Sequence, residues 1–167
     1  MEDTNDVVIG SSVMSYDDYL KACGWKWYMI SVHFLGWLRV LAIDLKKKHN
    51  ITHRQFYDDL FNWSIQNSST LLYKEYYVTM RLLNKVFKKE IPWGRKVKGA
   101  SDIYWEYEEA TGIYIAKNKK RFYNEIGDFL ENTYNSRYPV LVKKQSDKIA
   151  KAFADDLEES LEKILKD

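Results

Sequence analysis

The stretch from Ser15 to Leu38, SYDDYLKACGWKWYMISVHFLGWL, decides the fold class of this chain. Apolar side chains recur in it every three or four residues, which places them on one face of an α-helix: Tyr16, Tyr19, Leu20, Cys23, Trp27, Ile30 and Phe34. Trp25, Met29 and Val32 make the other sides of this helix apolar as well. Because a helix that is apolar all round is buried or docked, the stretch predicts a helical fold with a face that must be covered.

The two ends of this stretch carry helix-boundary signals. Ser15 is a helix-capping residue type, and Asp17 and Asp18 stand where negative charge stabilises a first turn. Gly36 predicts a break or a bend. A second helix is expected to continue to the lysines at 46–48, because cations suit a helix C-terminus. Its apolar positions are Leu38, Leu41, Ala42 and Leu45.

The same spacing predicts further helices over residues 52–67, 70–89, 106–134 and 139–167. Thr52 and Gln55 match the T-x-x-Q capping box that opens the first of these. A proline and two glycines make the segment 91–103 a loop. A break near Gly112 or Asn118 is expected within the long segment that follows.

These elements predict an all-α fold, an irregular bundle of about six or seven helices with a short extended N-terminal segment. Residues 1–14 form the extended segment, because they hold one short β-like run at Val7–Ile9. Residues 15–134 form the helical domain. Residues 139–167 form a C-terminal amphipathic helix that packs on this domain or extends from it.

The composition narrows the function classes. The chain has 167 residues and a formal net charge of +2, from 26 basic and 24 acidic residues, so no global field draws it to nucleic acid or membrane. The single cysteine, Cys23, excludes a disulfide framework and an all-cysteine metal site. The first residues lack a signal-peptide pattern, and the longest uncharged run, Trp27–Leu38, is too short to span a bilayer. We therefore expect a cytoplasmic protein with no membrane partner.

The hexapeptide Ser31–Gly36, SVHFLG, differs by one residue from D-x-H-x-x-G, a pattern in which a histidine binds the cobalt of cobalamin. In that pattern the aspartate orients the imidazole, and here its position is taken by Ser31. The hexapeptide also lies within a helical pattern rather than in a loop after a strand. We interpret His33 as a core histidine and not as a metal ligand.

One basic segment is a candidate for anion binding, and a second basic run is interpreted as a solvated face. The first runs from Lys85 to Lys98, and its candidate anion-binding residues are Lys88, Lys89, Arg95, Lys96 and Lys98. The second is Lys117–Arg121. Together they could also contact a nucleic-acid backbone. The alternative is an ordinary solvated helix end, since lysines favour helix C-termini.

Two other groupings carry weaker signals. In Ile103–Glu109, aromatic residues alternate with three glutamates, which predicts either a pocket lining or a loop anchor followed by a helix start. His49 and His53 flank a predicted turn without further metal ligands at a useful spacing. A small helical enzyme using His33 or His53 with Glu106 or Glu109 is a third hypothesis, although the spacing alone does not bring these residues together.

Three long segments resemble the C-terminal region of cobalamin-binding-domain-containing radical SAM proteins. They are NDVVIGSSVMSYDDYLKACGWKWYMISVHFLGWLRVLAIDL, ITHRQFYDDLFNW and DIYWEYEEATGIYIAKNKKRFYNEIGDFL. In that family a short strand and an M-S-x-x-D helix start follow the catalytic barrel, and a helical domain closes the chain. The resemblance covers about residues 6–131, and residues 132–167 are similar to no part of it.

The resemblance implies a non-catalytic accessory domain. The chain lacks the C-x-x-x-C-x-x-C motif and the α/β cobalamin domain of the family, so catalytic, cofactor-binding and metal-binding residues are expected to be absent from it. The [4Fe–4S] cluster, S-adenosylmethionine and cobalamin would belong to the barrel and cobalamin-binding domain of a parent or partner chain. On this view the chain docks there and shapes or closes the substrate channel.

Aromatic residues are the expected contacts of such a docking face. The candidate docking or channel-lining residues are Trp25, Trp27, His33, Trp37, Trp93, Arg95, Tyr104 and Trp105. An exposed apolar face also predicts self-association, so a homodimer is an additional candidate assembly. The alternative function is a stand-alone helical module that binds nucleic acid or protein through segments 85–98 and 117–121.

Overall fold

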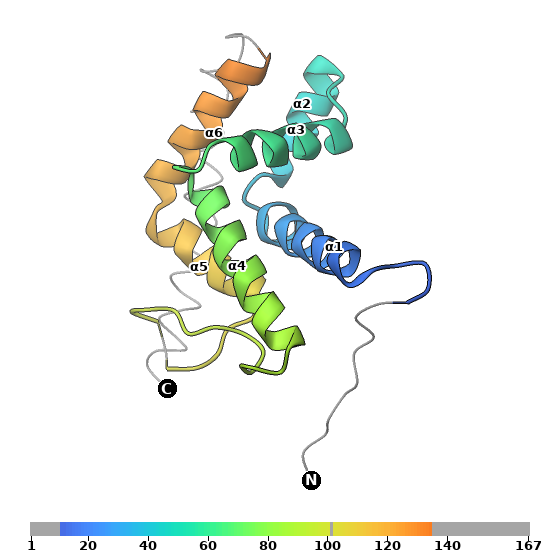
Figure 1. The fold of residues 1–167 in the computed structure, drawn as a ribbon. Helices are drawn as coiled ribbons and strands as arrows, with labels where there is room; N and C mark the ends of the chain where they lie inside the picture. The colour runs from blue at the N-terminus through green and yellow to red at the C-terminus, as the bar shows by residue number, and fades with distance from the viewer. Residues whose placement is uncertain (1–10, 101, 135–167) are drawn as a thin grey trace.

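The structure is a computed structural model that describes residues 11–100 and 102–134. Within these residues every regular element is helical, which confirms the predicted all-α class (Figure 1). The elements are α1 (Tyr16–Met29), the π-helical segment η1 (Ile30–Phe34), α2 (Arg39–His49), α3 (His53–Gln66), α4 (Leu71–Phe87), α5 (Tyr107–Lys117) and α6 (Lys119–Tyr134). The predicted strand at Val7–Ile9 and the predicted helix 139–167 lie outside the described residues.

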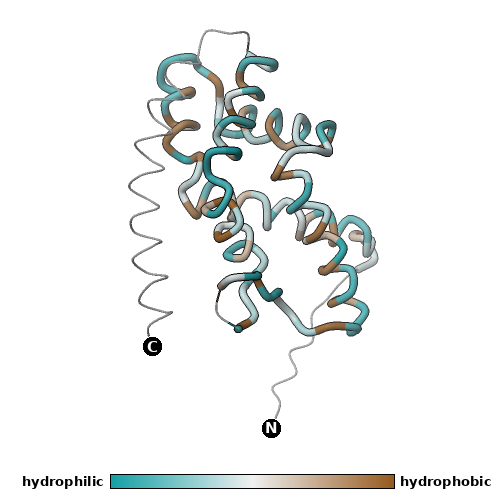
Figure 2. The backbone as a smooth tube through the Cα atoms, turned by 90° about the vertical axis from the view of Figure 1, so that its left-hand side faces the viewer, coloured by the Kyte–Doolittle hydropathy of each residue, from teal (hydrophilic) through white to brown (hydrophobic). Residues whose placement is uncertain are grey.

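The helices pack irregularly rather than as a parallel bundle. Figure 1 shows α4 and α5 together at the base, α6 rising from α5, and α2 and α3 at the opposite end. Helix α1 crosses between these groups and contacts α4 and α5. Along the chain, hydrophobic and hydrophilic residues alternate with the helical turns (Figure 2), as amphipathic helices require.

The predicted capping residues form the expected contacts. The Ser15 hydroxyl accepts a hydrogen bond from the Asp18 amide at 3.2 Å, and the Thr52 hydroxyl accepts one from the Gln55 amide at 3.1 Å. Thr70 caps α4 in the same way through the amide of Tyr73. Each contact satisfies an amide that the first helical turn leaves without a partner.

Two glycines behave differently from one another. Gly36 has a φ of +92°, and it ends the α1–η1 unit so that α2 leaves at 81°. Gly112 does not break its helix, because α5 runs through it and the side chain of Leu35 packs against it, with Cδ1 3.0 Å from where a Cβ would lie. The break within 106–134 is at Asn118, which separates α5 from α6.

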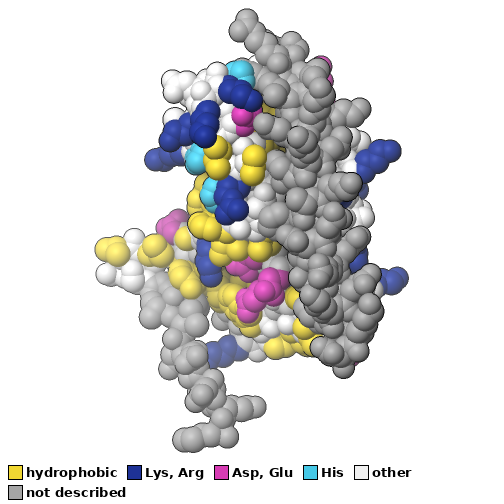
Figure 3. Space-filling model, turned by 180° about the vertical axis from the view of Figure 1, so that it is seen from behind, with side chains coloured by type: hydrophobic (Ala, Val, Ile, Leu, Met, Phe, Trp, Pro, Cys, Tyr) yellow, Lys and Arg dark blue, Asp and Glu magenta, His cyan; other side chains and the backbone are white. Residues whose placement is uncertain are grey.

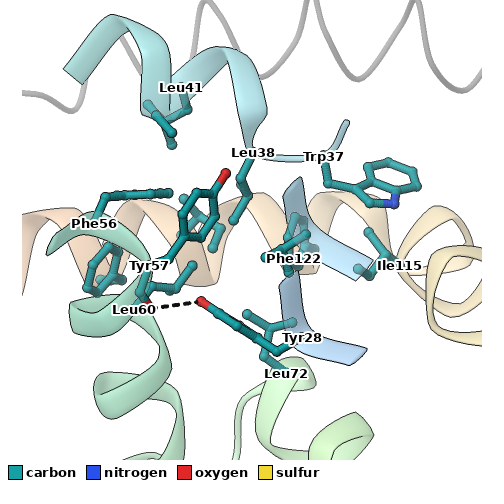
Figure 4. Packing of buried hydrophobic residues seen from close by; sticks show 14 of the residues in the cluster. Tyr28, Trp37, Leu38, Leu41, Phe56, Tyr57, Leu60, Leu72, Ile115 and Phe122 are labelled. Atoms are coloured by element: carbon teal, nitrogen blue, oxygen red, sulfur yellow. Dashed lines mark hydrogen bonds between the residues drawn. The ribbon is translucent and has the colours of Figure 1, made fainter. Parts of the chain in front are cut away.

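The core lies where the inner faces of α1, η1 and helices α2 to α6 meet (Figure 4). Figure 4 shows Tyr28 and Tyr57 among aliphatic residues, with the Tyr28 hydroxyl donating to the Tyr57 carbonyl at 3.3 Å. Its largest fully buried side chains are Trp27, Trp37, Tyr28, Tyr57, Tyr107, Phe56, Phe122 and Phe129. Aromatic rings therefore supply the largest side chains of the core.

No single helix in the described part of the chain is long and apolar enough to cross a membrane, and only the bent pair of Tyr16–Phe34 with Arg39–His49 reaches that length and composition together.

Candidate docking groove between the first and third helices

The stretch SVHFLG forms part of a π-helical turn. The Leu35 amide donates to the Ile30 carbonyl at 3.0 Å, which is an i→i−5 bond, and the Leu38 amide donates to the Val32 carbonyl at 2.9 Å. A π-turn inserts one extra residue into the helix and is frequent at functional sites. Within this turn Val32 is buried while His33, the next residue, is partly exposed.

Side chains of α1 and η1 meet those of α3 in antiparallel order. Trp25 makes an edge contact with Phe61, with ring centroids 5.2 Å apart. Eight residues later, His33 contacts Tyr57 at 5.3 Å and His53 at 6.1 Å. The i, i+4 and i, i+8 spacing on both elements places these residues on facing sides. This pairing holds α1–η1 and α3 together through side chains.

A groove of about 410 Å³ lies between these two elements. It is lined by Trp25, Met29, His53, Arg54, Tyr57 and Asp58. Tyr57 is buried and Met29 half-buried, whereas Trp25 is 36% exposed at the rim. Next to it Phe34 projects with 66% of its surface exposed, in ring contact with His33. We call the groove together with His33 and Phe34 the α1–α3 face.

His33, on this face, is held in its neutral form. Burial, with smaller contributions from the charges of His53 and Arg39, keeps the pKa of His33 below its ordinary value. Its Nδ1 lies 2.8 Å from the Tyr57 hydroxyl, and burial raises the pKa of that phenol. In a neutral imidazole, Nδ1 can accept a hydrogen bond from the Tyr57 hydroxyl, so the two side chains form a hydrogen-bonded pair at neutral pH.

The rim of the groove carries two opposite charges. Arg54 Nε lies 3.5 Å from Asp58 Oδ2, and the Arg54 side chain is 92% exposed. A pair this exposed contributes little to stability. Both charges can therefore turn to another binding partner at small cost. Figure 3 shows histidines, cations and hydrophobic side chains gathered on one face of the molecule.

Two of the predicted docking residues must be corrected. Trp27 and Trp37 are each only 2% exposed, because both pack into the chain's own core. The Trp27 indole N–H donates to Thr111 Oγ1 at 3.1 Å, which fixes it toward α5. Neither side chain can contribute to an exposed docking face. Trp25 and His33, in contrast, do lie on the α1–α3 face.

The other predicted docking residues lie at the loop between α4 and α5. Trp93 is 44% exposed and Tyr104 is 55% exposed. Trp105 is half-buried, and its backbone pairs with Arg95 in an isolated antiparallel bridge. The Trp93 indole donates to Glu106 Oε2 at 2.7 Å. The predicted loop anchor is therefore met by the backbone of Trp105 but not by the exposed Tyr104, and the indole that bonds Glu106 belongs to Trp93, outside Ile103–Glu109.

Arg95 is not an anion-binding residue in this structure. Its guanidinium donates to Glu75 Oε2 on α4, with the arginine side chain 15% exposed and the glutamate 6% exposed. Thr111 Oγ1 donates to the same Glu75 oxygen at 2.9 Å. Because the charge of Arg95 is already neutralised in the interior, its assignment to anion binding was wrong. We call Trp27, Glu75, Arg95 and Thr111 the buried polar cluster.

The remaining candidate anion-binding residues are spread over the same end of the molecule. Lys88 and Lys89 are exposed just after α4, and Lys89 adopts a φ of +59°. Lys96 forms an exposed ion pair with Asp102 at 2.5 Å. The Lys98 carbonyl accepts a hydrogen bond from Lys117 Nζ at 2.8 Å. These contacts do not converge on one anion pocket.

The hypothesis of a small helical enzyme required His33 or His53 beside Glu106 or Glu109, which is not the arrangement that the described contacts show. His33 and His53 come together, but Glu106 contacts Trp93 in the α4–α5 loop. No three metal-ligating side chains gather within the described residues. Sequence reasoning missed Met29, Tyr57 and Asp58 as groove residues, although His53 and Tyr57 are spaced four apart on one helix side.

Neither a comparison with protein-family models nor one with curated proteins gave a match to this sequence.

Proposed function

We propose that this chain is a non-catalytic helical accessory domain that docks on another protein domain through the α1–α3 face. By the family resemblance, that partner is the catalytic barrel of a cobalamin-dependent radical SAM enzyme. The chain's role there is to shape or close the substrate channel and exclude water from it. The sole cysteine cannot supply the thiolates of a [4Fe–4S] cluster, so the cofactors belong to the partner.

The observation that carries this proposal is the exposure of large apolar side chains beside a preformed groove. Phe34 at 66% and Trp25 at 36% are exposed although each makes a ring contact with a half-buried neighbour, His33 and Phe61 respectively. Exposed aromatics around a concave site are typical of protein interaction surfaces. On α2, Val40 and Ile43 add exposed apolar positions three residues apart.

Co-purification tests the proposal. The chain is expressed together with a tagged barrel and cobalamin-binding domain of a radical SAM protein encoded in the same genome. We expect a stable complex, and we expect Phe34→Glu to abolish it, because a carboxylate cannot enter an apolar interface without a partner. Tyr77→Glu is the matched control, since Tyr77 is an aromatic of similar exposure, 58%, on α4.

The co-purification experiment can give three results. A complex lost in Phe34→Glu and kept in Tyr77→Glu supports docking through the α1–α3 face. A complex lost equally in both variants shows that another surface or general instability is responsible. If the wild-type chain forms no complex with the barrel, the proposed function is wrong.

One observation favours a second candidate function, nucleic-acid binding. The contact between Lys117 Nζ and the Lys98 carbonyl joins the two basic segments in space. Beside it, a pocket of about 520 Å³ at the α5–α6 junction is lined by Lys117, Lys119, Lys120 and Arg121. Binding of single-stranded RNA or DNA that weakens steeply with salt, and is lost in Lys119→Glu/Lys120→Glu, would support this candidate.

A further inference from the structure

A strongly basic corner lies at one end of the groove. Residues 46–54, KKKHNITHR, connect the end of α2 to the start of α3 and contain four cations and two histidines but no carboxylate. Lys46, Lys47 and Lys48 are all exposed. Of the four cations, Lys48 pairs with Asp44 at 2.7 Å and Arg54 pairs with Asp58 at 3.5 Å, and no ion pair is described for Lys46 or Lys47. The corner therefore carries net positive charge on its surface.

This basic corner is continuous with the apolar groove. His53 and Arg54 belong to the corner by sequence, and both line the groove. The Nε2 atom of His53 is buried without a hydrogen-bond partner among the described residues. Because that atom is buried, His53 offers a ligand in the groove the surface of its ring, while the same ligand meets the cations of the corner.

We infer that the α1–α3 face binds an acidic amphipathic segment of the partner protein. Large apolar side chains of that segment enter the groove over Met29 and Tyr57, and its carboxylates face Lys46, Lys47 and Arg54. This inference rests on the proposed docking function and specifies the chemistry of the docking partner. Its basis is charge complementarity next to a concave apolar site, which is how amphipathic helices are recognised in grooves.

The concave shape favours a peptide over a membrane. An anionic bilayer also attracts cations beside apolar side chains, but it binds side chains that project from a helix face. Here Met29 and Tyr57 line a groove of about 410 Å³, and the hydroxyl of Tyr57 is fixed by its hydrogen bond to His33. Such a site accepts discrete side chains rather than a lipid surface.

The test uses the full chain and two synthetic peptides of helix-forming sequence. Both carry leucine at helical spacing, and they differ only in having glutamate or lysine at the polar positions. Binding is measured by fluorescence anisotropy at low and at physiological salt. A photo-reactive leucine analogue in the glutamate peptide identifies the contact residues by mass spectrometry. Vesicles of phosphatidylcholine and phosphatidylserine are tested in parallel.

We expect the glutamate peptide to bind and to cross-link to α1 and α3, and the lysine peptide to bind much more weakly. Lys46→Glu/Lys47→Glu should weaken binding about tenfold at low salt and less at physiological salt. The matched control is Lys88→Glu/Lys89→Glu, which changes the same charge at another helix end and should alter binding less than about twofold.

Other outcomes overturn the inference. Equal binding of both peptides, or loss of binding in the control, removes the charge complementarity. Binding to vesicles but to neither peptide assigns the face to a membrane. The chain has its own acidic stretch at 155–162, outside the described residues. If the peptide binds only after Glu158→Lys/Glu159→Lys, that stretch is the occupant and not a partner. Barrel co-purification that persists in any of these cases leaves the docking function standing.

Discussion

The buried polar cluster and the His33–Tyr57 pair both join helices through polar side chains, but one is closed and the other lies beside an open groove. In the closed cluster, Glu75 receives hydrogen bonds from Arg95 and Thr111, and Thr111 receives one from Trp27. Its carboxylate side chain is only 6% exposed. A buried charge is tolerated only when it is paired in this way.

The open pair has a different composition. His33 and Tyr57 are both neutral at pH 7, because burial lowers the pKa of the imidazole and raises that of the phenol. A ligand that covers the groove must displace water from this pair. Because both groups are neutral and already hydrogen-bonded to each other, removing that water costs little free energy. The comparison indicates that buried polar contacts tie α4, the loop and α5 together, whereas the α1–α3 face leaves a groove open beside its polar pair.

The largest expected effect is in the closed cluster. Arg95→Ala leaves the Glu75 carboxylate buried without its cation, which should lower the free energy of unfolding by about 3–5 kcal/mol. Urea denaturation followed by circular dichroism measures this change. Lys96→Ala is the control, because Lys96 is the next residue and its ion pair with Asp102 is exposed. We expect no measurable change in that variant.

A double variant sharpens this result. Replacing both charges, as in Glu75→Leu/Arg95→Met, removes the unpaired carboxylate and should recover much of the lost stability. Recovery shows that the cost arises from an uncompensated charge. If Arg95→Ala is as mild as Lys96→Ala, the buried polar cluster does not hold the loop to the bundle, and the contrast between the two regions is lost.

Local signals made the helix boundaries predictable. Ser15 and Thr52 cap their helices because a side-chain oxygen two or three residues before a free amide is within reach whatever the fold. The bend at Gly36 was predictable because glycine adopts a positive φ without a steric penalty. These are features of a few consecutive residues, so the sequence alone is sufficient to predict them.

Features that depend on distant residues could not be predicted. Trp25 and Trp27 belong to the same all-round apolar helix, and only packing against α5 determines that Trp27 is the buried one. The Glu75–Arg95 pair joins a helix to a loop 20 residues away. The π-turn has no signature either, because ISVHF fits an ordinary helical spacing equally well. Of the candidate docking residues in Ser15–Leu38, Trp25 and His33 therefore lie on the α1–α3 face, whereas Trp27 and Trp37 are buried.

A smaller effect is expected at the bend beside the open groove. Gly36→Ala forces a Cβ into a backbone with φ of +92°, which should cost about 1–2 kcal/mol and disturb the π-turn that presents His33. Gly127→Ala is the matched control. Gly127 lies within α6 with open space around it, so alanine should stabilise that helix by roughly 0.5–1 kcal/mol.

Opposite signs for the same substitution would show that the cost is conformational. Urea denaturation gives both values, and peptide binding gives a second readout for Gly36→Ala alone. If Gly36→Ala is neutral, the bend tolerates another backbone conformation, and the π-turn is not what fixes the shape of the α1–α3 face.

The smallest expected effect concerns the protonation of His33. An unfolded imidazole binds a proton near pH 6.5, and the folded pKa of His33 lies below its ordinary value. The unfolded state therefore binds more protons in this range, so the stability contribution is complete above about pH 6.5 and falls as the pH drops toward the folded pKa. His33→Asn, which does not titrate, should remove this part of the pH dependence.

Thermal unfolding at about pH 7.5 and about pH 5.5 measures it. The fall in Tm between the two should be smaller in His33→Asn than in the wild type, by on the order of 1–2 °C. Taking the difference between the two proteins cancels the contributions of titrating groups that do not interact with His33. A larger fall in the variant would mean that protonation stabilises the fold at His33, which is incompatible with a neutral hydrogen-bonded pair. The His33–Tyr57 pair would then carry charge, and its contrast with the buried polar cluster would disappear.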